Sequence, residues 1–151
     1  MSADFPFAQA LAALPHGPEF RFIDRLTALE GGKLGTATYH IRGDESFLAG
    51  HFPEQPMLPG VILIEALAQL AGIVSQSDPD HPPMKDLRLT AVRQAKILGA
   101  ATPGQTIVIE ASITGRMGPL VQADGTIYLE GSRETVFLTG AIVLSGEPPG
   151  A

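Results

Sequence analysis

Apolar and polar residues alternate along much of this chain, and the alternation predicts β-strands. Residues 20–29 (FRFIDRLTAL) and 33–42 (KLGTATYHIR) follow this pattern, as the two faces of a strand require. The Gly31-Gly32 pair between them can adopt the positive φ angles of a tight hairpin. Four more strand-like runs follow at about 85–98, 105–114, 119–130 and 134–145. We therefore expect six antiparallel strands.

One segment has a different pattern and predicts a long buried helix. Residues 61–74, VILIEALAQLAGIV, are apolar on every face except at Glu65, Gln69 and Gly72. Pro59 precedes them, and proline suits the first turn of a helix because its missing N–H would have no partner there. A helix that is apolar all round belongs inside a protein. Two strands, a buried helix and four strands fit the hot-dog fold, an α+β architecture in which an antiparallel sheet wraps one helix.

The composition is that of a globular protein, and it limits the kinds of partner that the chain can bind. Its 151 residues suffice for one domain with its own core, which we expect to span 1–151. Only 17% of the residues are charged against 44% hydrophobic, so we expect apolar surface to be buried between subunits. The formal net charge of −6 argues against nucleic acid as a partner, because phosphate binding needs clustered Lys and Arg. The absence of cysteine excludes disulfides and thiolate chemistry.

No segment predicts export or membrane insertion. The first residues, MSADFPFAQALAALPHG, lack a basic n-region, and Asp4, Pro6 and Gln9 interrupt their apolar positions. No run reaches the roughly 18 uncharged apolar residues that a membrane-spanning helix needs. We therefore expect a cytoplasmic protein without a membrane span.

Glu65 is the most informative residue, because it is the only ionisable group in the apolar helix. Burying a carboxylate costs several kcal/mol unless it is partnered. Glu65 is therefore either a functional carboxylate or one half of a structural ion pair, and the pattern alone leaves both interpretations open. Gln69 lies one turn further along the same face, where it can donate a hydrogen bond that orients the carboxylate or form a simple surface pair.

The loop and the first turn before Glu65 add two candidates. Gly60 falls where free amide groups at the positive end of the helix dipole can stabilise a carbonyl that gains negative charge; alternatively, it only lets the loop turn. His51, in GHFPEQPMLPG, is a candidate general base or ligand. We interpret the remaining histidines as structural: His16, His40 and His81.

Other chemistries find no support in the motifs. A His and a Glu fourteen residues apart, with no third ligand at a suitable spacing, do not make a zinc or facial-triad site, so we expect no metal. The sequence has no G-x-S-x-G elbow and no G-x-x-x-x-G-K-[ST] or G-x-G-x-x-G phosphate loop. We expect no cofactor.

Residues 50–69, GHFPEQPMLPGVILIEALAQ, resemble the GHFPxxPxxPGVLxxEAxAQ motif of the β-hydroxyacyl-acyl-carrier-protein dehydratases of bacterial fatty-acid synthesis. Leu14-Pro15-His16, with Phe20 and Asp24-Arg25, resembles the family's opening LPHRxPFLLVDR. The likeness runs from about Leu14 to Leu144. It implies the hot-dog fold and the removal of water from a 3-hydroxyacyl thioester to give a trans-2-enoyl thioester.

The resemblance also implies roles for the candidate residues. His51 corresponds to the base that takes the C2 proton, and Glu65 to the group that delivers a proton to the departing 3-hydroxyl. The expected substrate-binding residues are Gly60, whose amide would bind the thioester carbonyl, Val61, Phe52 and Gln69. In this family the histidine and the carboxylate of one site come from different subunits, which implies a homodimer, with a trimer of dimers left open. A glutamate rather than an aspartate implies dehydration without isomerisation.

The expected partner is an acyl carrier protein bearing a phosphopantetheine thioester. Carrier proteins are acidic, and residues 84–98 hold four basic residues, Lys85, Arg88, Arg93 and Lys96, against one acidic residue, Asp86. This basic strand can steer docking, with Arg93 and Lys96 as the expected contacts, or it is an ordinary solvated edge.

Three alternatives compete with this interpretation. A hot-dog acyl thioesterase shares the scaffold, and a specialised dehydratase of polyketide or secondary lipid synthesis shares the chemistry as well. The pairing of GHFP with PGVxxxE favours a dehydratase over a thioesterase. The third alternative, an acyl-chain binder without catalysis, is disfavoured by the presence of both His51 and Glu65.

Overall fold

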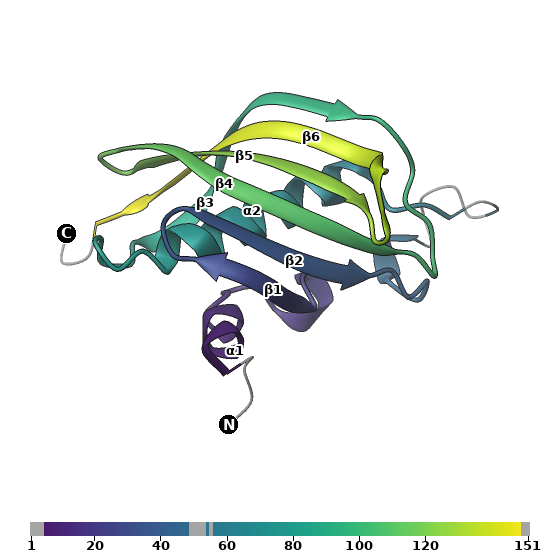
Figure 1. Cartoon of the computed structure of the whole chain (residues 1–151), viewed down its shortest axis with the longest axis horizontal. Helices are drawn as coiled ribbons and strands as arrows, with labels where there is room; N and C mark the ends of the chain where they lie inside the picture. Colours follow the sequence, from purple (N-terminus) through teal and green to yellow (C-terminus); the bar gives the residue numbers. More distant parts are fainter. Residues whose placement is uncertain (1–4, 49–53, 55, 149–151) are drawn as a thin grey trace.

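A computed structural model describes residues 5–48, 54 and 56–148 of the chain. Figure 1 shows a curved sheet lying across one long helix, with a short N-terminal helix below the β1 edge. In chain order the elements are α1 (Phe5–Ala12), a 3-10 turn (Pro18–Phe20), β1 (Arg25–Glu30), β2 (Leu34–His40), a second 3-10 turn (Ser46–Leu48), α2 (Gly60–Gln76), β3 (Lys85–Ile97), β4 (Thr106–Met117), β5 (Leu120–Leu129) and β6 (Ser132–Glu147).

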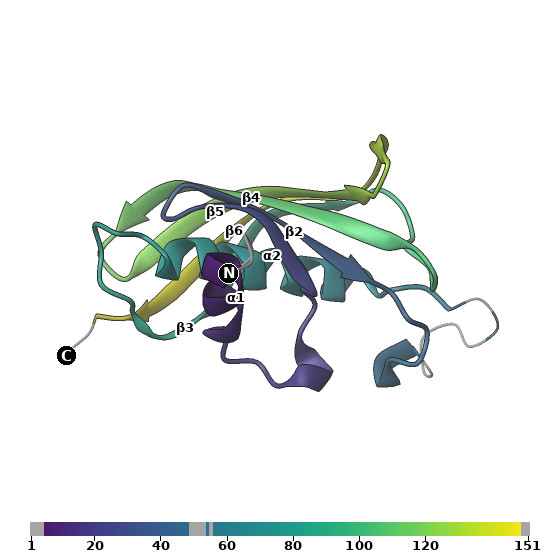
Figure 2. The same cartoon turned by 60° about the horizontal axis from the view of Figure 1, so that its bottom comes forward.

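The six strands form an antiparallel sheet in the order β1-β2-β4-β5-β6-β3. The chain leaves β2, forms α2, continues into β3 at the far edge, and returns to β4 in the middle of the sheet. The turned view of Figure 2 shows α2 along one face of the sheet. This is the predicted hot-dog architecture, with its strands and helix in the predicted order.

The apolar character of α2 explains its position against the sheet. Leu63, Leu67 and Leu70 are fully buried. Gly125 on β5 permits the close approach, because a Cβ at that position would overlap Cδ1 of Leu67. A larger residue at Gly125 would therefore push the helix away from the sheet. Within the described part of the chain, no helix is long and apolar enough to cross a membrane.

The predicted hairpin at Gly31-Gly32 is present and contacts the helix. The N–H of Lys33 donates to the carbonyl of Glu30 over 2.9 Å, and Gly32 has a φ of 80°. The N–H of Gly32 also donates to the carbonyl of Val74 over 2.8 Å. The Val74 carbonyl also accepts the N–H of Ser77, the C-cap of α2, so the turn adds a second hydrogen bond at this end of the helix.

The sequence pattern fails at two places near the N-terminus. The strand predicted for residues 20–29 begins only at Arg25. The backbone before it bonds to a side chain of α2, because the N–H of Phe22 donates to Oε1 of Gln69 over 2.9 Å. The pattern also missed α1, whose Phe7 and Leu11 pack against the core.

Strand β3 lies at an edge of the sheet. Its pairing with β6 is irregular, and no strand among the described residues pairs with its outer side. Val92 and Ile97 are 46% and 54% exposed on this strand. A long edge strand with exposed apolar side chains is a surface on which another strand can pair.

Candidate active site

Along one face of α2, the side chains become more exposed to solvent towards the N-terminus of the helix. Val61, Glu65 and Gln69 follow one another at intervals of four residues and so share this face. Val61 is 69% exposed, the Glu65 side chain is 21% exposed and Gln69 is 2% exposed. Glu65 therefore lies at the boundary between the buried helix and the accessible surface, where a carboxyl group can meet a bound molecule.

Gln69 connects Glu65 to the segment before β1. Its amide nitrogen donates to the Phe20 carbonyl over 2.8 Å and to Oε1 of Glu65 over 3.3 Å. Its amide oxygen accepts the N–H of Phe22 over 2.9 Å. A buried amide needs such partners. Of the two alternatives that helical spacing left open, the hydrogen bond from Gln69 to Glu65 is present, whereas substrate binding by Gln69 stays a prediction.

His16 also contacts the candidate carboxylate. Its Nε2 lies 3.2 Å from Oε1 of Glu65, and the two side chains are 29% and 21% exposed. The pattern of apolar residues offered no reason to pair residues so far apart in the sequence. The one available signal was the resemblance of Leu14-Pro15-His16 to the opening motif of the dehydratase family.

The start of α2 leaves backbone amides available beside Glu65. Pro59 is the N-cap and makes no side-chain capping bond. The N–H groups of Ile62 and Leu63 both donate to the Pro59 carbonyl, so the earlier amides of Gly60 and Val61 precede the helical ladder. These amides lie at the positive end of the helix dipole, where they can stabilise a bound group that gains negative charge.

Gly60 is in contact with the end of β3. A Cβ at Gly60 would overlap Cδ1 of Ile97, so glycine lets this side chain approach the helix terminus. Around the same end of the helix, several apolar side chains are exposed: Phe20 at 45%, Val61 at 69%, Ile97 at 54% and Leu98 at 58%. An apolar surface beside a carboxyl group suits an acyl chain or a second subunit.

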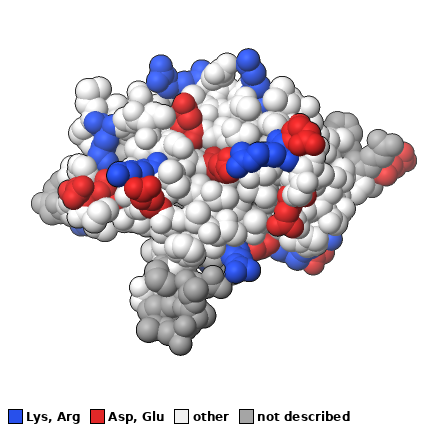
Figure 3. All heavy atoms as spheres, viewed as in Figure 1, with Lys and Arg blue, Asp and Glu red and all other residues white. Residues whose placement is uncertain are grey.

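Two predicted site residues, His51 and Phe52, lie outside the described residues. The two predicted docking residues are described. Arg93 and Lys96 lie on β3 and are exposed, and Lys96 directly precedes the Ile97 that contacts Gly60. In Figure 3, basic side chains stand along the upper edge of the molecule, where β3 runs in Figure 1.

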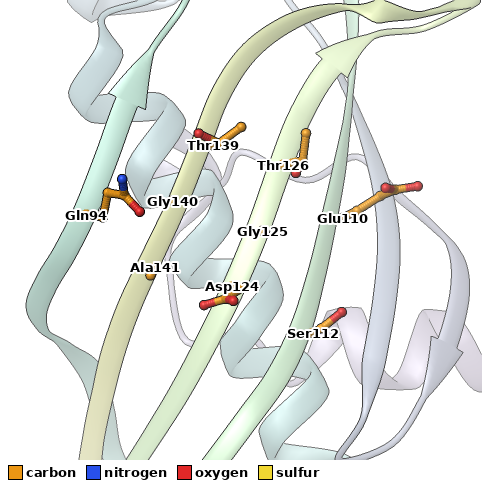
Figure 4. Close-up of a pocket in the computed structure, with 9 residues that line it drawn as sticks. All are labelled: Gln94, Glu110, Ser112, Asp124, Gly125, Thr126, Thr139, Gly140 and Ala141. Atoms are coloured by element: carbon orange, nitrogen blue, oxygen red, sulfur yellow. The ribbon is translucent and has the colours of Figure 1, made fainter.

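A hollow of about 350 Å³ on the sheet is separate from these residues. Figure 4 shows its lining on β3 to β6, with α2 behind the sheet. Polar side chains dominate the lining: Gln94, Glu110, Ser112, Asp124, Thr126 and Thr139. Alternate residues of β4, such as Ile109, face the core instead and are fully buried. The hollow therefore lies on the outer face of the sheet and does not contain Glu65.

The other described histidines have local partners. Nδ1 of His40 lies 2.9 Å from the Thr106 hydroxyl, and Nδ1 of His81 lies 2.9 Å from Asp78. Hydrogen bonds from the N–H of Asp80 and from His81 hold the pKa of Asp78 below its usual value. Among the described residues, no group of three or more His, Cys, Asp or Glu could hold a metal ion.

The fold and the position of Glu65 define a hot-dog protein with a candidate acid–base site, and comparison with known proteins specifies the family. Residues 14–137 match the FabA-like domain family. A protein of Herpetosiphon aurantiacus named 3-hydroxyacyl-[acyl-carrier-protein] dehydratase FabZ is 32% identical over 127 residues, which cover 80% of this chain and 89% of the relative. A protein of the same name from Macrococcus caseolyticus is 34% identical over 80% of this chain and 82% of the relative. This chain belongs to the FabA-like family.

Two solved structures share the fold at low sequence identity. The dehydratase heterocomplex ApeI:P from Xenorhabdus doucetiae superposes with a TM-score of 0.72 at 19% identity, over 90% of this chain and 89% of that one. Zebrafish thioesterase superfamily member 2 superposes with a TM-score of 0.70 at 11% identity, over 96% of this chain and 99% of that one. These neighbours are named for different activities, a dehydratase and a thioesterase, so the shared fold alone does not define a reaction.

Proposed function

We propose that this chain is a hydro-lyase that dehydrates 3-hydroxyacyl thioesters, carried by acyl carrier protein, to trans-2-enoyl thioesters in fatty-acid or related lipid synthesis. The single observation that carries the proposal is the position of Glu65, a part-buried carboxyl group on the open face of α2 whose Oε1 accepts a hydrogen bond from Gln69 and lies 3.2 Å from His16. Membership of the FabA-like family and the names of the relatives support the same reaction.

In the proposed reaction, His51 and Glu65 act as base and acid. His51 accepts the C2 proton, and the electron pair of that C–H bond forms the C2=C3 double bond. The C3–O bond breaks with its electron pair on oxygen, and Glu65 gives that oxygen a proton, so that water leaves. Exchange with solvent afterwards returns a proton to Glu65 and removes one from His51.

The start of α2 supports the charge that develops in this step. Removal of the C2 proton places enolate-like charge on the thioester carbonyl. The Gly60 amide, at the positive end of the helix dipole, would donate a hydrogen bond to that oxygen. The exposed Val61 lies on the same face as Glu65 and would contact the acyl part of the substrate.

We propose a homodimer in which each site combines Glu65 of one subunit with His51 of the partner subunit, and a trimer of dimers stays open. The outer side of β3 and the apolar side chains of Val92, Ile97 and Leu98 support an interface at this edge. Pairing there would continue the sheet from one subunit into the next.

The proposed macromolecular partner is an acyl carrier protein. Arg93 and Lys96 are exposed on β3, and Lys96 lies next to the Ile97 that contacts the start of α2. Positive side chains at this place would attract an acidic carrier and bring its thioester near Glu65.

An assay with purified protein separates this function from a thioesterase. The substrates are 3-hydroxyacyl and trans-2-enoyl carrier-protein thioesters of several chain lengths, with the matching CoA esters alongside. Mass spectrometry follows the loss or gain of water, and a thiol reagent follows hydrolysis. We expect interconversion of hydroxyacyl and enoyl thioesters without thiol release. Thiol release without interconversion would establish a thioesterase instead.

A further inference from the structure

The two oxygens of the Glu65 carboxyl group have different surroundings. Oε1 lies 3.2 Å from Nε2 of His16 and 3.3 Å from Nε2 of Gln69. No described residue donates a hydrogen bond to Oε2. Oε1 therefore accepts a hydrogen bond from Gln69 and lies close to His16, while Oε2 is left for a bound molecule.

We propose that His16 is a positioning residue for Glu65. The N–H at its Nε2 holds Oε1 together with Gln69, so that Oε2 carries the proton that passes to the departing hydroxyl oxygen. This inference rests on the proposed dehydratase function and names one more residue that the reaction needs. His16 itself transfers no proton in this scheme, and no bond to it forms or breaks.

The ring of His16 has little freedom to turn away. The guanidinium group of Arg21 donates to the backbone carbonyls of Leu14 and His16, both over 3.1 Å, which fixes the loop. The Phe20 ring stacks on the imidazole, with ring centroids 6.1 Å apart and an angle of 27° between the planes. The loop therefore presents the imidazole to Glu65 in a defined orientation.

The surroundings of the second ring nitrogen identify the atom that donates. Nδ1 of His16 is buried, and no described group forms a hydrogen bond with it. A hydrogen on Nδ1 would be a buried donor without an acceptor, which is unfavourable. The tautomer with its hydrogen on Nε2 leaves Nδ1 with only an unpaired acceptor and places its hydrogen on the nitrogen that lies 3.2 Å from Oε1 of Glu65.

A purely structural role for the contact is less consistent with the geometry. Gln69 already bonds the backbone of Phe20 and Phe22 to α2. Arg21 independently donates to the backbone of the loop that carries His16. The His16 and Glu65 side chains are 29% and 21% exposed, so solvent reaches both and can replace a lost contact between them. Loss of the imidazole should therefore affect the reaction more than the fold.

Three substitutions at His16 test the proposal. His16→Gln places an amide nitrogen near the position of Nε2 and keeps the donor. His16→Asn is equally polar but too short to reach Glu65, and His16→Leu keeps bulk without a donor. We expect Gln to retain kcat within about 3-fold of the unsubstituted protein, and Asn and Leu to lower it about 10- to 100-fold at a nearly constant KM. Thermal melts should be similar for Gln and Asn.

The Glu65→Gln background provides a second readout. That variant has no carboxyl proton to position, so adding His16→Asn should cause no further loss of kcat. Equal kcat for the unsubstituted protein and all three His16 variants, with Glu65→Gln inactive, would overturn the role of His16 and leave the dehydratase function standing. A loss in His16→Gln as large as in His16→Leu would also overturn it, because a donor alone would then be insufficient. An unsubstituted protein without dehydratase activity would overturn both proposals.

Discussion

Gln69 donates a hydrogen bond to Oε1 of Glu65 over 3.3 Å, one helical turn further along α2. The same amide group accepts the N–H of Phe22 and donates to the carbonyl of Phe20. One side chain thus links the candidate acid to the segment that carries His16. Phe20 and Phe22, which were predicted to lie in a strand, bond to this amide, and β1 begins only at Arg25.

Substitution of Gln69 should affect both stability and turnover. Gln69→Ala leaves the buried N–H of Phe22 without an acceptor, which should lower the free energy of unfolding by about 1–3 kcal/mol. It also removes a donor to Glu65 and should lower kcat. Urea denaturation and the dehydration assay measure the two effects.

Gln76 offers a matched control on the same helix. The Gln76 side-chain amide donates to the Met84 carbonyl over 2.8 Å and accepts the Met84 N–H over 3.0 Å. It lies at the last residue of α2, away from Glu65. Gln76→Ala should lower stability and leave kcat unchanged. An equal loss of kcat in both variants would mean that Gln69 acts only through the fold.

Tyr39 should make the protein less stable in alkaline solution. Burial, and next the negative charge of Glu45, raise the pKa of Tyr39 above its ordinary value. The folded protein therefore keeps this proton at a pH where the unfolded chain, with a tyrosine pKa of about 10, has lost it. The free energy of unfolding should fall above about pH 10, by up to about 1.4 kcal/mol per pH unit.

The control for this pH dependence is the second tyrosine. Burial also raises the pKa of Tyr128, which donates to Glu110 over 3.1 Å. Tyr39→Phe should flatten the alkaline decline more than Tyr128→Phe, because Tyr39 is 1% exposed. Unfolding curves between roughly pH 9 and 11 show the difference. Identical slopes in the Tyr39→Phe variant and the unsubstituted protein would contradict this account.

The basic residues of β3 should act on carrier docking. Arg93→Glu combined with Lys96→Glu should raise KM for carrier-protein substrates, and the effect should shrink at high salt. The KM for small pantetheine thioesters should be nearly unchanged. Lys33→Glu, at the distant β1–β2 turn, reverses an exposed charge as a control. A similar rise in KM for both kinds of substrate would show that Arg93 and Lys96 have a structural role instead.

A shared site predicts complementation between two inactive proteins. His51→Ala and Glu65→Ala should each abolish dehydration alone. Mixed subunits would contain some dimers with one intact site, so activity should return as subunits exchange. Native mass spectrometry verifies that exchange occurs. If mixed dimers form and activity stays absent, each site takes both residues from one subunit.

The main elements could be predicted because their patterns are local. The apolar run after Pro59 predicted α2, and the Gly31-Gly32 pair predicted the turn that meets its C-terminal end. The helix α1 was not predicted because Pro6 and Gln9 interrupt its apolar positions.

The site could be predicted only in part. Glu65 stood out as a charge in an apolar helix, and Gln69 followed from helical spacing. The contact of His16 with Glu65 depends on how the loop before β1 crosses α2, which no local pattern encodes. The roles of His51 and Phe52, which lie outside the described residues, stay predictions.

Glu65→Gln tests the central claim most directly. The substitution keeps the volume and the hydrogen-bonding capacity of the side chain but removes the proton that it delivers. If Glu65 is the general acid, the variant should melt at or above the temperature of the unsubstituted protein, and dehydration should slow by roughly two to four orders of magnitude. If Glu65 instead anchors an ion pair with His16, the variant should lose stability while its folded fraction keeps normal turnover. Melting curves and dehydration rates from one preparation decide between these results, and the second would contradict the account.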